Sequence, residues 1–428
     1  MQILYLFSII LINPLGTSRG QIWTQPKIAI LAVICAYNLQ LICENKQDIK
    51  LSRNWWIVAI AFSIFLGDCL ISSLLSPAGF MRSLLGHPTH LSGLIYWGLI
   101  AVFTLTNSLV LQIKPKLLKQ QLQGFIAGSV ILVLSIIPQY FNWTIDYTIN
   151  SGQLFNNNIL LSSIYKGHQP IGLYSHRGHS AFVLAAAAAA ILSSWKSKIF
   201  SSKVLLILPV IITALLLTQT RAGIVALLAS LVFLMGNNRI VWISAITSLV
   251  LIISISTTRQ IEGISIVKQL TSDRLWIWEI SKSAINKNPY HGYGLDGFNI
   301  AYPQMKNVKK EVIFTPYTKS HNLIIDWAVS IGVAGAALYL LIFGYCFFIN
   351  ESPLSAVVIV YLVYTMTWFE SGQFTHIAWW ALSLFNYEKS INNYNFTSQP
   401  KVCTSLESTV RSRISTAVKG VFRKLPIW

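Results

Sequence analysis

Apolar blocks long enough to cross a lipid bilayer recur along almost the whole chain, and this recurrence limits the fold more than any other feature. A bilayer core needs roughly 20 helical residues to cross. With 54% hydrophobic and only 11% charged residues, the chain has the composition of a polytopic membrane protein. The blocks lack the strict alternation of barrel strands, and a helix in lipid satisfies its own backbone hydrogen bonds. The sequence therefore predicts an all-α polytopic membrane protein.

The distribution of basic residues orients these helices. About twelve transmembrane helices are expected, over residues 2–16, 27–43, 55–75, 91–112, 122–140, 178–195, 203–219, 221–235, 240–257, 321–348, 353–369 and 374–387. Lysine and arginine are concentrated in alternate loops, beginning with 44–54, and in the segment after the last helix. Because such loops face the cytoplasm, both termini are expected there. The loop over 258–320 then lies on the outer face.

The chain is expected to divide at that loop. Helices 1–9 fill residues 1–257, the large extracytoplasmic loop spans 258–320, helices 10–12 span 321–388, and a basic cytoplasmic tail spans 389–428. Thr271-Ser272-Asp273 is a good helix start, so the loop should contain a short helix that ends near Asn286, before Pro289. Trp276, Ile277, Ile280 and Ala284 share one face of that helix.

The net charge of +18 does not indicate nucleic acid as a partner, because the cations lie between apolar blocks rather than in one basic domain. Membrane topology and anionic lipid headgroups account for most of the excess. The five cysteines lack the spacing of a metal site or a disulfide framework. Membrane lipids are the expected partners, and neither metal nor nucleic acid is expected.

Three polar residues far apart in sequence should meet at the outer face. Arg221 lies in a tight turn between two helices, Arg274 in the first turn of the loop helix, and His321 where the chain re-enters the membrane. The guanidinium fork suits phosphate, as does a helix N-terminus. Histidine titrates near neutral pH and suits a general base. Each residue also has a structural alternative. Arg221 could be an interfacial anchor, and Arg274 could form a surface ion pair with Asp273 or Glu279. His321 could be a capped or solvated residue at a helix end.

A second group of candidates could support this site. His176, Arg177 and His179 lie at the outer end of one helix, without a third ligand that would make the histidines a metal site. Tyr293 offers aromatic surface for a sugar or prenyl chain. Asp326 lies about 140° round a helix from His321, too far to orient it, so we expect it to pair with a cation on another helix.

Four fragments together carry a resemblance to a known family. They are Thr220-Arg221-Ala222-Gly223, Asp273-Arg274-Leu275, Asn288-Pro289-Tyr290-His291-Gly292-Tyr293-Gly294 and Ser320-His321-Asn322. In their order and spacing they resemble the O-antigen ligase and polymerase superfamily over about residues 175–341. A further turn, Gly86 to Leu94, resembles one that many members have before their fourth helix, with a histidine in place of an arginine often found there.

The resemblance implies a membrane glycosyltransferase of the GT-C-like class. Such enzymes take a glycan from an undecaprenyl-diphosphate carrier at the outer face of the bacterial plasma membrane. They pass it to a glycan or lipid-linked acceptor in cell-surface polysaccharide or lipopolysaccharide biosynthesis, without a metal or other cofactor. Carried onto this chain, Arg221 and Arg274 would hold the diphosphate, and His321 would position or deprotonate the acceptor hydroxyl.

Two other classes of protein remain open at this point. A polysaccharide or lipid-linked oligosaccharide transporter could share twelve helices and a positive charge, but it would more often show charges inside several helices and matching repeats. A noncatalytic scaffold would not need Arg221, Arg274 and His321 to converge. Within the enzyme class, the sequence does not separate ligase from polymerase, because both use the same donor and differ in acceptor.

Overall fold

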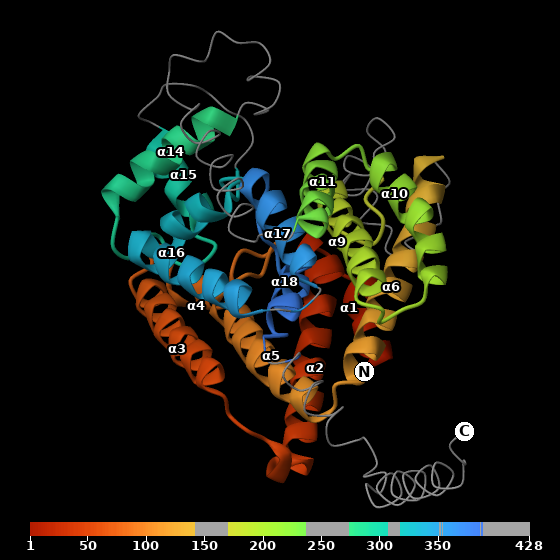
Figure 1. Ribbon diagram of the computed structural model, residues 1–428. Helices are drawn as coiled ribbons and strands as arrows, with labels where there is room; N and C mark the ends of the chain where they lie inside the picture. Colours follow the sequence, from red (N-terminus) through yellow and green to blue (C-terminus); the bar gives the residue numbers. More distant parts are fainter. Residues whose placement is uncertain are drawn as a thin grey trace, which may run out of the picture. The chain divides into compact units, whose positions relative to one another are not determined.

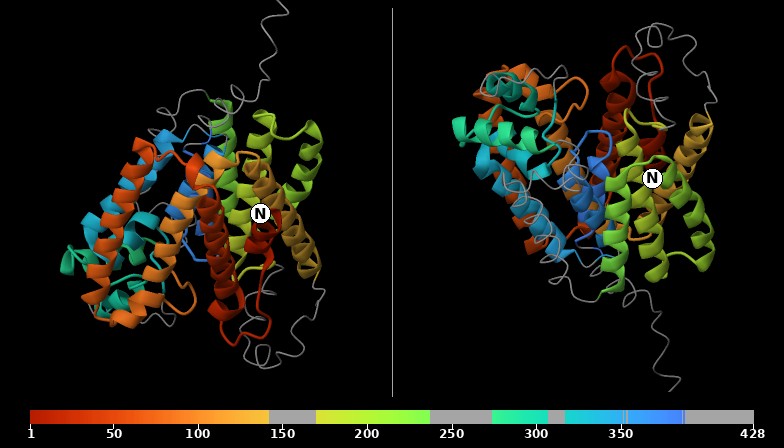
Figure 2. Two further views of the ribbon diagram at one scale, coloured as in Figure 1. Left: turned by 90° about the horizontal axis from the view of Figure 1, so that it is seen from below. Right: turned by 90° about the horizontal axis from the view of Figure 1, so that it is seen from above.

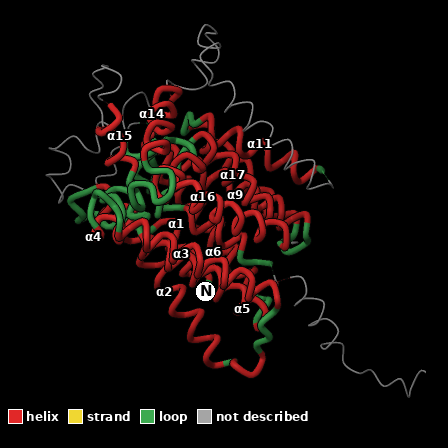
Figure 3. The backbone as a smooth tube through the Cα atoms, turned by 90° about the vertical axis from the view of Figure 1, so that its left-hand side faces the viewer, coloured by secondary structure: helices red, strands yellow, loops and turns green. Residues whose placement is uncertain are grey.

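The computed structural model describes residues 1–141, 170–236, 274–306 and 317–387, apart from 351, 353 and 386. Within these ranges the backbone forms helices, turns and loops and contains no strand (Figure 3). The described residues belong to one compact unit, Met1–Tyr387. The expected helix over 240–257 and the basic tail over 389–428 lie outside the described residues.

The described helices follow the apolar blocks of the sequence. Those that overlap expected membrane spans are α1 (Gln2–Ile10), α2 (Gln25–Glu44), α3 (Arg53–Leu74), α5 (Leu94–Ile113), α6 (Leu117–Tyr140), α9 (Arg177–Lys196), α10 (Leu208–Leu217), α11 (Arg221–Met235), α16 (Leu323–Ile349), α17 (Ser355–Thr367) and α18 (Thr375–Leu382). Among the described helices, 6 are long and apolar enough to cross a membrane. The all-helical membrane class is confirmed, whereas the count of twelve stays a prediction.

Helix α9 lies at the centre of one group of helices, packed against α6, α10, α11 and α17 (Figure 1). Its run Ala185–Ala190 is completely buried, because small side chains let neighbouring helices approach closely. A Cβ at Gly223 of α11 would lie 2.9 Å from the Cβ of Ala181. This contact sits near the first turns of both helices, so α9 and α11 begin at the same end of the group.

Three further α-helices lie outside this set: α4 (Phe80–Leu85), α14 (Arg274–Lys287) and α15 (Phe298–Lys306). Helices α14 and α15 pack on each other and on α16, as both views of Figure 2 show. Three residues of the predicted apolar face of α14 are confirmed, since Ile277, Ile280 and Ala284 are buried in a cluster with Phe298 of α15 and Val329 of α16. The side chain of Trp276 lies outside the described residues. The loop helix therefore rests on α16 through an apolar contact.

Helix α16 is broken at Gly332, whose φ of 79° and ψ of 176° are not helical. The turn between α14 and α15 docks at this break. Val333 N donates to the Pro289 carbonyl at 2.8 Å, and Tyr293 N donates to the Val329 carbonyl at 2.9 Å. A Cβ at Gly292 would lie 2.5 Å from the Ser330 carbonyl. The glycines of this turn thus permit close approach of two backbones.

Replacing Gly332 by alanine should destabilise the protein. The φ and ψ at this position are open almost only to glycine, at a cost of about 1–3 kcal/mol for other residues. A Cβ there would also overlap the Tyr290 backbone and lie 2.7 Å from the Pro289 oxygen. Thermal unfolding of the purified protein in nanodiscs measures the loss.

Gly344→Ala on the same helix is the matched control, since nothing lies within 4 Å of a Cβ there. It should be neutral or stabilising by up to about 1 kcal/mol. Equal unfolding midpoints for Gly332→Ala and the control would contradict the docking of the turn at the break.

Candidate active site

His321 lies two residues before α16, in the left-handed region with a φ of 59°. Asn322 caps the helix, its Oδ1 accepting from the Ile324 and Ile325 N–H groups at 3.1 Å each. The imidazole Nδ1 of His321 is 3.2 Å from the Lys319 carbonyl oxygen. Because a carbonyl only accepts, Nδ1 carries the hydrogen, and Nε2 is the basic nitrogen of the neutral ring.

Aromatic rings hold the His321 imidazole edge-on. Its centroid is 5.2 Å from that of Trp368 at 84°, 5.1 Å from Phe369 at 89° and 5.9 Å from Tyr317 at 73°. Trp368 and Phe369 stack on each other with centroids 5.4 Å apart, in the segment between α17 and α18. Edge-to-face contacts have a preferred geometry, so the ring orientation is defined on several sides.

The same aromatic pair reaches three further histidines. The His176 centroid is 5.0 Å from Trp368, His179 is 5.7 Å from Phe369, and His90 is 5.1 Å from Phe369. Trp368 and Phe369 therefore join the segments before α5, α9 and α16. Sequence reasoning missed both residues, since an aromatic at a helix end is common in a membrane protein.

The predicted supporting histidines are brought to this cluster and have structural contacts there. His176 caps α9, its Nδ1 accepting from the Gly178 N–H at 3.0 Å. His179 Nδ1 lies 3.3 Å from Gln373 Oε1. Within the described ranges, no group of three or more His, Cys, Asp or Glu side chains is placed to hold one metal ion.

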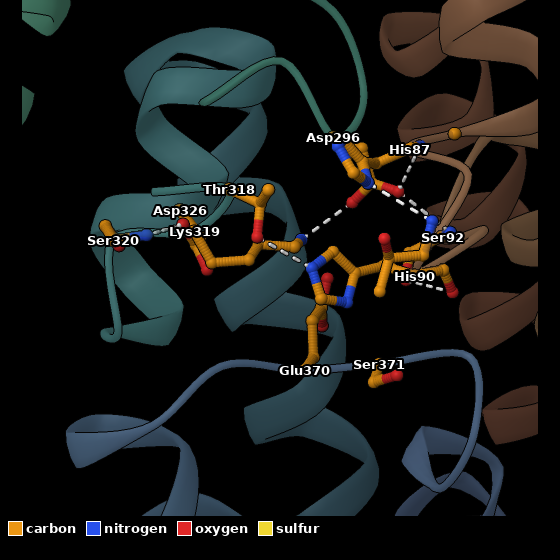
Figure 4. Close-up of polar contacts among 12 residues, drawn as sticks. His87, His90, Ser92, Asp296, Thr318, Lys319, Ser320, Asp326, Glu370 and Ser371 are labelled. Atoms are coloured by element: carbon orange, nitrogen blue, oxygen red, sulfur yellow. Dashed lines mark hydrogen bonds and ion pairs between the residues drawn. The ribbon is translucent and has the colours of Figure 1, made fainter. Parts of the chain in front are cut away.

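A buried ion pair lies beside this cluster (Figure 4). Lys319 Nζ is 2.7 Å from Asp296 Oδ1, with side-chain exposures of 3% and 0%. The other oxygen, Oδ2, accepts from the N–H groups of His87 and Ser92 at 2.9 Å each. Burial alone would raise the pKa of Asp296 and lower that of Lys319, but their mutual attraction overrides it in both, so both stay charged.

The turn before α5 supplies two neutral histidines to the same region. His90 Nε2 lies 2.9 Å from Thr318 Oγ1, and burial holds the pKa of His90 well below its usual range. Burial, together with Arg82, lowers the pKa of His87 to about 4. His87 is thus uncharged at neutral pH, which leaves this turn without the cation that an arginine would supply.

Two more carboxyl groups act on Lys319. Asp326 Oδ1 accepts from the Ser320 N–H at 2.6 Å, so it fastens the chain just before α16 instead of pairing with a cation on another helix. Glu370 is 4% exposed and accepts from the Tyr361 hydroxyl at 3.2 Å. Burial raises the pKa of Glu370 to about 8, although Lys319 opposes the shift.

The predicted arginines all begin helices. Arg221 is the first residue of α11 and is exposed; Arg177 is the first residue of α9, at the same end. Arg274 is the first residue of α14, and its side chain lies outside the described residues. One turn later, Trp278 Nε1 donates to the Ser320 carbonyl at 3.0 Å. This bond sets the start of α14 beside His321.

Tyr293 does not offer the expected aromatic surface. Its side chain is fully buried among the residues that join α14, α15 and α16. Its backbone carbonyl accepts from Ser76 Oγ at 2.8 Å. Tyr293 is a packing residue of the docked turn, and its ring is not open to a substrate.

Replacing Glu370 by glutamine should change how stability depends on pH. The folded chain binds this proton up to about pH 8, whereas the unfolded carboxyl has a pKa of 4.5, so wild type loses stability as pH rises between these values. Glutamine keeps an acceptor for Tyr361. We expect equal free energies of unfolding at pH 5, and at pH 9 a free energy of unfolding that is higher for Glu370→Gln by on the order of 2 kcal/mol.

The matched control is Glu44→Gln, at an exposed carboxylate that accepts from Gln40 Nε2. It should follow the wild-type curve at both pH values. A Glu370→Gln curve parallel to wild type from pH 5 to 9 would show that this carboxyl does not retain its proton.

Part of the chain matches a known protein family. Residues 204–340 match the family model described as O-antigen ligase. The matched segment contains Arg221, Arg274, Asp296, Lys319 and His321. A search of curated proteins finds no match. The family carries glycosyl-transferring activity in general and acts on lipid-linked glycans in a membrane. Over residues 204–340, the chain is similar to the O-antigen ligase family.

Proposed function

We propose that this protein transfers or polymerises a glycan from an undecaprenyl-diphosphate carrier at the outer face of the bacterial plasma membrane. His321 is the group that receives the acceptor proton, and Arg221 and Arg274 bind the diphosphate. Arg177 lies at the same end as Arg221 and adds a third cation. The acceptor is a glycan or a lipid-linked glycan.

The observation that carries the proposal is the set of contacts at His321. Its Nδ1 is committed to the Lys319 carbonyl, and rings on two sides fix its plane. A base held in one tautomer and orientation needs no rearrangement before it accepts a proton. Trp278 ties the start of α14 to Ser320, next to this base.

The proposed reaction is a displacement at the anomeric carbon of the donor. The acceptor hydroxyl oxygen forms a bond to the anomeric carbon while the bond from that carbon to the diphosphate oxygen breaks. The hydroxyl proton passes to His321 Nε2, and the electron pair leaves with the carrier diphosphate. Arginine side chains and helix N-termini stabilise the charge that develops on the leaving group. A prenyl diphosphate already leaves readily, so positioning and charge supply most of what is needed.

The carboxyl groups of the site support transfer rather than hydrolysis by a carboxylate pair. A glycosidase places one acid and one base or nucleophile on either side of the scissile bond. Asp296 is in an ion pair, Asp326 holds the Ser320 N–H, and Glu370 accepts from Tyr361. Each of these described carboxyls is therefore engaged with the protein.

Replacing His321 by alanine should abolish glycan transfer. The assay follows a synthetic undecaprenyl-diphosphate oligosaccharide with purified protein in nanodiscs, and product size separates ligase from polymerase. We expect turnover to fall about 100-fold or more for His321→Ala, because loss of a general base costs typically 10²–10⁴-fold. Arg221→Ala and Arg274→Ala should weaken both donor binding and turnover.

Two exposed residues provide matched controls: His291→Ala, in the turn after α14, and Arg53→Ala, at the start of α3. Both should keep wild-type turnover. Full activity in folded His321→Ala would overturn the site. No turnover by wild type with a range of acceptors would overturn the proposed reaction and favour a transporter, which a flipping assay with the same lipid would detect.

Cysteine labelling tests the orientation in the membrane. Tyr290, in the turn after α14, is 76% exposed, and Cys43 is exposed near the end of α2. In intact cells, a membrane-impermeant maleimide should label Tyr290→Cys above the wild-type background. Cys43 should react only after permeabilisation. Labelling in the reverse pattern would place the site on the cytoplasmic side.

A further inference from the structure

Each residue from Thr318 to Asn322 contacts another segment of the chain or, in the case of Ser320, the first turn of α16. Thr318 Oγ1 is within hydrogen-bond distance of His90 Nε2, and Lys319 Nζ forms an ion pair with Asp296. The Ser320 N–H donates to Asp326, and Asn322 Nδ2 donates to the Met366 carbonyl at 3.1 Å. The His321 ring packs edge-on against Trp368 and Phe369. We call residues 318–322 the anchored segment. Five consecutive anchors exceed what starting a helix requires, since Asn322 alone provides the cap.

Lys319 connects two of these contacts. Its side chain ends on Asp296 at 2.7 Å, and its backbone carbonyl accepts the Nδ1 hydrogen of His321 at 3.2 Å. A displacement of Lys319 therefore moves the hydrogen-bond partner of the imidazole. His321 itself has a positive φ, a conformation that the surroundings must maintain for a residue with a Cβ.

Asp296 provides a fixed point for this lysine. Its Oδ2 accepts two backbone N–H groups, of His87 and Ser92, so the carboxylate is held by the turn before α5 as well as by its own chain. A carboxylate with one oxygen on two amides and the other on an ammonium has little freedom to rotate. The position of Lys319 is thus set by two segments distant in sequence.

We propose that Asp296 and Lys319 form a positioning pair that sets the orientation of the His321 imidazole. The role in turnover rests on the function proposed above, whereas the effect on the ring does not. Neither residue is a phosphate ligand in this assignment. Lys319 is buried and already faces three carboxyl groups, so its charge is compensated within the protein.

The competing explanation is that the ion pair only stabilises the fold. Two variants distinguish this explanation from a positioning role. Asp296→Asn retains a carbonyl oxygen that accepts from both backbone N–H groups and removes only the contact to Lys319. It leaves a buried unpaired ammonium, which destabilises the fold. Adding Lys319→Met removes that ammonium, and replacing both members of a buried pair is often neutral.

The double variant Asp296→Asn/Lys319→Met should therefore recover the wild-type unfolding midpoint in nanodiscs without recovering turnover. We expect kcat to stay about 10- to 100-fold below wild type, the loss that misplacement of a catalytic group by about 1 Å produces, with an unchanged KM. The single variant Lys319→Arg preserves the ion pair and should retain most of the wild-type turnover. Lys282→Met, at an exposed lysine of α14, is the control.

The rate at which diethyl pyrocarbonate modifies His321 reports how firmly the imidazole is held, and it needs no substrate. The modified imidazole is quantified by mass spectrometry in chymotryptic peptides that begin at Thr318. Loss of the pair should release the ring and raise the modification rate of His321 in the double variant, but not in Lys282→Met. Arg substitution at Lys319 should leave the rate near that of wild type.

The outcomes distinguish the two proposals. Turnover that returns together with the unfolding midpoint, or a His321 modification rate equal to wild type in the double variant, would overturn the positioning pair. Absence of turnover in wild type would overturn the proposed reaction, and the modification rate would then decide the pair by itself.

Discussion

The buried contact between Lys319 and Asp296 is the interaction on which the arrangement of the site depends. It joins the segment before α16 to the turn before α15, and the second carboxylate oxygen extends the connection to the turn before α5. An ion pair this deeply buried is stable only when its remaining lone pairs are also satisfied. The two backbone N–H groups meet that condition.

A second connection between segments is apolar. Trp368 and Phe369 contact histidines from before α5, α9 and α16. A Cβ at Gly178 would lie 3.1 Å from the Trp368 ring, so α9 approaches this residue as closely as its first turn permits. The ion pair and the aromatic pair thus both hold the anchored segment, the first through an electrostatic contact and the second through packing.

The sequence predicted the elements of the fold more completely than the contacts within the site. Apolar length marked the helices, and periodicity marked the buried face of α14, because each depends on neighbours in the chain. His321 and the helix-start arginines could be chosen because polar residues are conspicuous beside apolar blocks. Asp296 could not, since its partner is 23 residues away and its backbone donors more than 200 away. The prediction that Tyr293 offers aromatic surface failed because the exposure of its side chain depends on how its turn docks at Gly332.

The charges of the site are divided between two places. Near His321, Lys319 faces Asp296, Asp326 and Glu370, so the buried part of the cluster has no spare positive charge. The arginines stand apart, at the first residues of α9, α11 and α14. A base accepts a proton more readily beside carboxylates, whereas a leaving diphosphate is stabilised by guanidinium groups and free N–H groups. In the proposed function, this separation keeps the guanidinium groups away from the proton acceptor and beside the leaving diphosphate.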